Sequence, residues 1–140
     1  RNLVVKSLIC DKYISHDWWC YQIISAAGGE IIYNSKKFVR YRQHDKNLIG
    51  GNDRLIDKLK RFKIFFSGVF KKWTDINIKN LKKNRTLINK ENFETLQKFI
   101  KAREAKSPLK RLIFYLRSGV FRQTSIENFI FIIGMILKKI

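Results

Sequence analysis

The segment DWWCYQIISAA, residues 17–27, constrains the fold most, because apolar residues cover almost the whole circumference of a helix built from it. Ser15 can cap this helix, the helix dipole favours Asp17 in its first turn, and the Gly pair at 28 and 29 can end it. A helix that is apolar nearly all round is normally buried. The sequence therefore predicts a well-buried helix at this point in the chain.

Two segments after this helix have the composition of β-strands. EIIYN at 30–34 and FVRYR at 38–42 are rich in β-branched and aromatic residues, and the short SKK between them suits a strand connection. The polar, Gly-rich QHDKNLIGGND follows as a loop. Residues 1–53 are therefore expected to form an α/β unit, a buried helix plus a strand pair.

From residue 54 onward the pattern is helical. One apolar stripe repeats every four and three residues, as a and d positions do: Leu55, Leu59, Phe62, Phe66, Val69 and Trp73. Further helices are predicted at about 90–104, from Ser107-Pro108, and from Thr124 or Ser125. The helix after Ser107-Pro108 has an apolar stripe of Leu109, Leu112, Ile113 and Leu116. Residues 54–140 are thus predicted to be a mainly α-helical, basic region.

The net charge of +19 is unevenly distributed. Residues 1–53 hold eight Lys/Arg and five Asp/Glu, which leaves +3, whereas residues 54–140 hold 22 and six, which leaves +16. Such a basic region favours an anionic partner, either nucleic acid or a phospholipid surface. An AT-rich coding sequence, which enriches Ile, Lys and Asn together, is the alternative source of the charge.

Several classes of protein are disfavoured by what the sequence lacks. Cys10 and Cys20 have no zinc spacing and read as ordinary thiols, and no nucleotide-binding or hydrolase motif and no D-x-D occurs. The longest apolar run, FIFIIGMIL, has nine residues, far short of the ~20 that span a bilayer. The only methionine is Met135, so we expect a piece of a longer protein.

Asp17 is the first candidate for chemistry. Trp18 and Trp19 beside it can form an apolar wall on which sugar rings stack, and a partly desolvated carboxylate has a raised pKa and is a better base near neutral pH. In the simpler interpretation Asp17 only interacts with the helix dipole and the tryptophans are core residues. His16 is ambiguous, since a lone histidine is more often a structural group than a catalyst.

A second set of candidate binding residues lies in the predicted second strand and just after it. Arg40, Arg42 and His44 follow one another at every second position, so an extended chain presents all three on one face. Two arginines can bind a diphosphate through paired hydrogen bonds, and a histidine can donate to it or ligate a metal. A solvated strand edge is the alternative.

These motifs resemble a known family. Residues 15–50, with HDWW and YRQH in order and at the family's spacing, resemble the C-terminal part of a family 2 glycosyltransferase catalytic domain of the GT-A fold. The likeness is greatest to bacterial rhamnosyltransferase-like enzymes of surface-polysaccharide assembly. RSGVFRQT at 117–124 resembles the helical extension of such enzymes, and the rest of residues 54–140 resembles it mainly in composition.

The resemblance implies an inverting transferase that moves a sugar from a nucleotide sugar to a saccharide or lipid-linked acceptor. Asp17 would be the general base, Trp18 and Trp19 would shape the acceptor pocket, and His16 would bind substrate. Arg40 and Arg42 would bind substrate, and His44 would lie near the diphosphate and its divalent metal, Mg²⁺ or Mn²⁺. The family's D-x-D and nucleotide-binding strands belong to an N-terminal half that this chain lacks, so the chain by itself is expected to be inactive.

Three functional hypotheses follow. In the first, residues 1–53 are the acceptor-side part of the transferase and the basic helices dock, from the cytoplasm, on the inner face of an anionic membrane. In the second, the helical region binds nucleic acid, although its aromatic residues lie on apolar stripes rather than among arginines. In the third, the stripe at 55–73 pairs a non-catalytic helical domain with another chain.

Overall fold

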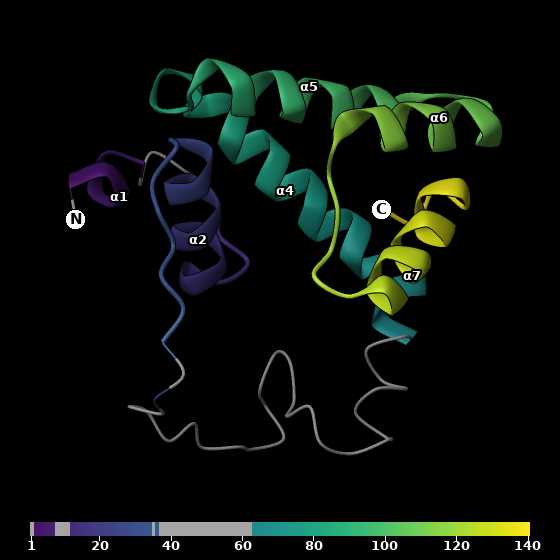
Figure 1. Ribbon diagram of the computed structural model, residues 1–140, viewed down its shortest axis with the longest axis horizontal. Coiled ribbons are helices and arrows are strands. Elements are labelled where there is room, and N and C mark those ends of the chain that lie inside the picture. Colours follow the sequence, from purple (N-terminus) through teal and green to yellow (C-terminus); the bar gives the residue numbers. More distant parts are fainter. Residues whose placement is uncertain (1, 8–11, 35, 37–62) are drawn as a thin grey trace.

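The computed structural model describes residues 2–7, 12–34, 36 and 63–140. Its elements are α1 (Asn2–Lys6), α2 (His16–Ala26), α4 (Val69–Lys83), the 3₁₀ turn η1 (Arg85–Leu87), α5 (Lys90–Glu104), α6 (Pro108–Ser118) and α7 (Ser125–Ile136), and residues 63–66 add a helical turn (Figure 1). The described chain is thus mainly helical, and no strand occurs in those ranges.

The predicted α/β fold of a GT-A fragment is therefore wrong. Residues 30–34, the first predicted strand, form no strand, and Ile32 and Tyr33 are 81% and 88% exposed. The second predicted strand, residues 38–42, lies outside the described residues. The β propensity of Ile and Tyr reflects packing on a half-buried pleated surface, and the described structure has no sheet on which EIIYN could pack.

The core lies where α4, α5, α6 and α7 meet. Figure 1 shows α5 and α6 side by side along one edge, with α4 running diagonally away from them and α7 near α6. Phe131 of α7 is the centre of the cluster, with ring centroids 5.6 Å from Tyr115, 6.3 Å from Phe99 and 6.3 Å from Phe70. The other buried members are Ile78, Ala102, Met135 and Ile140.

Local signals set the starts of the last three helices where the sequence predicts them. The side chain of Asn89 accepts a hydrogen bond from the Asn92 amide at the start of α5, and Thr124 accepts one from the Glu127 amide at the start of α7. Pro108 occupies the first turn of α6, where its missing N–H costs nothing. These predicted starts are confirmed.

The stripe predicted over 55–73 does not belong to one continuous helix. Gly68 has a φ of 89°, in the left-handed region that glycine adopts readily, and it separates the turn at 63–66 from α4. Trp73 packs within the chain, against Trp18, with ring centroids 6.2 Å apart. Residues 55–62 lie outside the described residues.

Helix α6 does not bury the face that its apolar pattern predicts. Leu109, Ile113 and Leu116 are 64%, 38% and 61% exposed, whereas Arg111 and Ser118 are 7% and 4% exposed. Three of the four residues of the stripe, which would ordinarily be the packing face, therefore point outward, and the fourth, Leu112, is half-buried.

Arg111 is buried because three helix-end carbonyls need its donors. Its Nε donates to the Ile136 carbonyl over 3.1 Å, and its Nη1 donates to the carbonyls of Ala105 and Lys106 over 3.1 and 3.0 Å. Ala105 and Lys106 follow α5, and Ile136 ends α7. Carbonyls at a helix C-terminus lack partners within the helix and carry partial negative charge, so one guanidinium joins the ends of α5 and α7.

Helix α2 packs on the helical region across the predicted domain boundary at residue 53. The Asn92 side chain donates to the carbonyls of Ser25 and Ala26 at the end of α2, over 2.9 and 3.2 Å. The Asn80 side chain of α4 donates to the carbonyl of Lys12 over 2.9 Å. The division into residues 1–53 and 54–140 stays a prediction.

Candidate functional site

The candidate site is the N-terminus of α2, where the resemblance places the general base. Ser15 has extended backbone angles, φ −151° and ψ 139°, and its carbonyl accepts from the Trp19 amide over 3.0 Å. Its side chain makes no capping hydrogen bond. The helix start is instead stabilised by the favourable interaction of the Asp17 carboxylate, in the first turn, with the helix dipole.

Trp19 anchors this helix start from behind. Its side chain is 2% exposed, and its Nε1 donates to Ser7 Oγ over 3.1 Å, while Ser7 Oγ donates to the Val4 carbonyl over 2.7 Å. The Tyr13 ring lies 6.0 Å away, centroid to centroid. Trp19 thus has almost no surface left for a ligand, and it ties α2 to α1.

Trp18 anchors α2 on the other side. Its ring centroid lies 6.3 Å from that of Phe70 and 6.2 Å from that of Trp73, and the second pair is edge-to-face. Such aromatic pairs contribute ~0.5 to 1.5 kcal/mol beyond the area that they bury. Trp18 is half-buried, so part of its surface remains open.

His16 and Asp17 point outward from this anchored helix. His16 Nε2 lies 2.7 Å from Asp17 Oδ1, and the two side chains are 88% and 82% exposed. The expected half-dry carboxylate against indole rings is therefore a solvated carboxylate paired with a histidine. The predicted catalytic role of Asp17 remains a prediction, and so does the role of His16 in substrate binding.

The structure does not place the three residues predicted to bind a diphosphate. Arg40, Arg42 and His44 all lie outside the described residues. Among the residues described, no group of three or more His, Cys, Asp or Glu side chains could hold a metal ion. Nothing in the described geometry therefore assigns a position to the predicted divalent metal.

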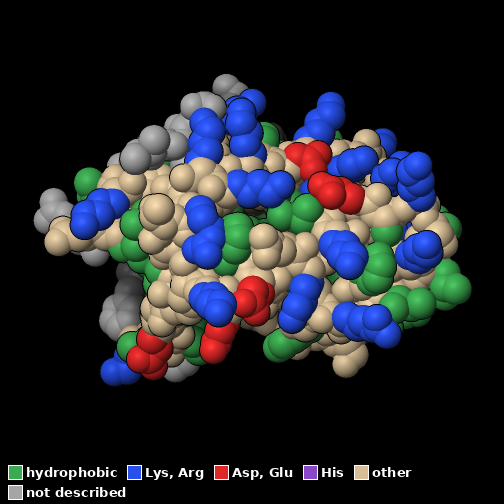
Figure 2. Space-filling model, turned by 90° about the horizontal axis from the view of Figure 1, so that it is seen from above, with side chains coloured by type: hydrophobic (Ala, Val, Ile, Leu, Met, Phe, Trp, Pro, Cys, Tyr) green, Lys and Arg blue, Asp and Glu red, His purple; other side chains and the backbone are tan. Residues whose placement is uncertain are grey.

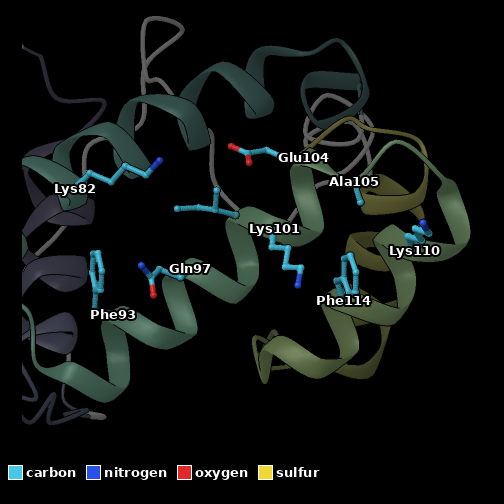
Figure 3. Close-up of a pocket in the computed structure, with 9 residues that line it drawn as sticks. Lys82, Phe93, Gln97, Lys101, Glu104, Ala105, Lys110 and Phe114 are labelled. Carbon is cyan, nitrogen blue, oxygen red and sulfur yellow. The ribbon is translucent and has the colours of Figure 1, made fainter.

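A groove that the sequence did not indicate lies between α4, α5 and α6 (Figure 3). It has a volume of about 600 Å³, and its charged and aromatic lining residues are Lys82, Lys101, Lys110, Glu104, Phe93 and Phe114. Lys101 points towards Phe114, with Nζ 4.8 Å from the ring centroid. No motif joins these residues in the sequence, so only the packing of α4, α5 and α6 brings them together.

Lys and Arg dominate the surface on the side of α5 and α6. Figure 2 shows their side chains spread over this face, with few Asp and Glu among them. This distribution agrees with the charge of +16 in residues 54–140 and gives the face a positive potential.

Comparisons of the chain with protein-family models, with curated proteins and with solved structures find no match. Among the described residues, no helix has both the length and the apolar character that crossing a bilayer requires.

Proposed function

We propose that this chain is the acceptor-side part of an inverting glycosyltransferase, which moves a sugar from a nucleotide sugar to a saccharide acceptor in cell-surface polysaccharide synthesis. The ordered motifs HDWW at 16–19 and YRQH at 41–44 support the proposal. The helical fold does not, because the expected strand at 30–34 is absent. Since function belongs to sites rather than to folds, the residues of α2 carry the proposal.

The observation that carries the proposal is the presentation of Asp17. Its carboxylate is open to an incoming acceptor, yet it stands on a helix whose first turn is held by Trp18 and Trp19. A reactive group on a rigid element keeps its geometry better than one on a loop. An acceptor sugar that covers His16 and Asp17 would also exclude water from the pair.

In the proposed reaction, Asp17 takes the proton of an acceptor hydroxyl while that oxygen attacks the anomeric carbon of the donor. The new carbon–oxygen bond forms as the bond to the nucleoside diphosphate breaks, and the configuration inverts. His16 contacts Oδ1 and so orients the carboxylate, which leaves Oδ2 for the proton. A divalent metal would balance the charge of the leaving diphosphate.

The test is Asp17→Asn in the intact protein. We expect a loss of ~10² to 10⁴ in the rate of sugar transfer, because the amide cannot act as a general base. Release of nucleoside diphosphate with and without acceptor measures the rate, and circular dichroism monitors folding.

Glu30→Gln is the matched control, because Glu30 is an exposed acidic side chain that follows the same helix. Its transfer rate should be unchanged. A near-normal rate for Asp17→Asn would remove Asp17 as the base.

We also infer that the protein works from the cytoplasm at the inner face of the membrane, where lipid-linked acceptors lie. The charge of +16 in residues 54–140 supports this, since anionic lipid attracts basic segments.

Nucleic acid is the second candidate for the anionic partner, because the same charge would attract phosphates. Burial of Phe99 and Phe131 in the core weighs against it, as these rings are withdrawn from base stacking. Retention on a polynucleotide column with a steep salt dependence would favour nucleic acid, and elution at low salt would disfavour it.

A further inference from the structure

Helix α6 presents an apolar stripe to solvent on the side away from the core. Leu109, Ile113 and Leu116 are spaced four and three residues apart and so share one face. They are 64%, 38% and 61% exposed, and Phe121, just after the helix, is 80% exposed. An apolar helix face that is left exposed in this way is a candidate interaction site.

Basic side chains border this stripe. Lys110 and Arg117 are exposed, and each follows a leucine of the stripe, so both lie about 100° further round the helix. The segment from 105 to 126 contains no acidic residue. At the right-hand end of the face in Figure 2, hydrophobic side chains lie among Lys and Arg.

The order of faces round α6 is that of a helix lying in a membrane interface. Arg111, Tyr115 and Ser118 face the core and hold α6 in place. Leu109, Ile113 and Leu116 face outward, with Lys110 and Arg117 beside them. Such a helix places its apolar side chains at the boundary of headgroups and acyl chains, while its cations contact anionic headgroups.

We propose that α6 docks on an anionic phospholipid bilayer, with Leu109, Ile113 and Leu116 entering the apolar boundary and Lys110 and Arg117 on the headgroups. This deepens the membrane association under the proposed function and rests on that part of it alone. It does not require Asp17 to be a base.

The experiment is flotation of the full chain with two kinds of vesicle, phosphatidylcholine alone and an equal mixture with phosphatidylglycerol. We expect the unchanged chain to float with the mixed vesicles only. Leu109→Ser with Leu116→Ser should weaken binding by at least about a hundredfold, the loss expected when two leucines are no longer buried in the apolar boundary. Lys110→Gln with Arg117→Gln should weaken it about fivefold per residue.

Matched controls have the same chemical changes elsewhere. Ile31→Ser with Ile32→Ser removes two exposed apolar side chains, and Lys72→Gln with Lys90→Gln removes two exposed charges, so both should bind much better than the α6 variants. Asp17→Asn should float as the unchanged chain does, which separates this proposal from the catalytic one.

Undiminished flotation of the leucine variant would overturn the proposal. A concentration-dependent dimer that the leucine replacements abolish would also overturn it, because the stripe would then belong to a second copy of the chain. A third result would also overturn it: polynucleotide displaces the chain from the vesicles, and the α6 charge variant and the control charge variant lose binding equally. The positive charge would then attract any anion, and α6 would not be a specific lipid-binding face.

Discussion

Helices α2 and α6 each have eleven residues, yet only α6 buries polar or charged side chains, Arg111 and Ser118, in addition to the aromatic Tyr115. In α2, Trp19 and Ile23 are buried and Asp17 is exposed, whereas in α6 Arg111 is buried and Leu116 is exposed. The neighbours explain the difference. Helix α2 packs against rings and a hydroxyl, while α6 lies beside helix ends whose carbonyls need donors.

The largest effect should come from the buried ring of α2. Trp19→Ala removes the packing of the indole and the N–H that donates to Ser7 Oγ, so we expect a loss of ~3 to 5 kcal/mol in the free energy of unfolding. Urea denaturation followed by circular dichroism measures it. A loss below ~1 kcal/mol would mean that α2 does not depend on this anchor.

The next effect should come from the buried cation of α6. Arg111→Ala leaves the carbonyls of Ala105, Lys106 and Ile136 without this donor, and we expect a loss of about 3 kcal/mol. Arg117→Ala, an exposed arginine of the same helix, should change the free energy of unfolding by at most about 0.5 kcal/mol. Equal effects in urea denaturation would remove the contrast between the two faces of α6.

A smaller effect should appear in the pH dependence of the free energy of unfolding. Burial raises the pKa of Tyr115 above its usual 10.0, although Arg122 partly opposes this. The folded chain then holds the phenolic proton at a pH where the unfolded chain loses it, so this contribution to stability is complete below pH 10.0 and falls above it.

Tyr115→Phe should therefore reduce the alkaline loss of stability. Near neutral pH it should be neutral or stabilising by up to ~1 kcal/mol, because the buried hydroxyl has no hydrogen-bond partner. Urea midpoints at neutral and alkaline pH test both points. Tyr21→Phe, at a side chain that is 54% exposed, is the control, and an alkaline slope equal in all three chains would refute the assignment.

The smallest effect on stability should come from the outward leucines. Leu109→Ser and Leu116→Ser should each change the free energy of unfolding by at most about 0.5 kcal/mol, since neither side chain is in the core. Ile78→Ala, in the buried cluster, should cost ~2 to 5 kcal/mol. If the leucines cost as much as Ile78, the exposed stripe packs inside the protein in solution.

For the candidate site, the residue pattern predicted a helix start with an acidic first turn, and α2 has one. It did not predict that Trp19 would bond to Ser7 while Asp17 stayed solvated, because both features depend on α1 and α4. The groove beside Lys101 was missed for the same reason, since its walls come from three helices.

The sequence by itself determined where α5, α6 and α7 begin, because a cap or a proline acts on the amides of its own first turn. Tertiary structure alone decided that residues 30–34 form no strand and that α6 points Leu109 and Leu116 outward. A strand forms only where another strand can pair with it. Which face of a helix is buried depends on which of its side chains can pack against or hydrogen-bond to the neighbouring elements. Around α6 the neighbours need donors to the carbonyls at the ends of α5 and α7, and Arg111 supplies them.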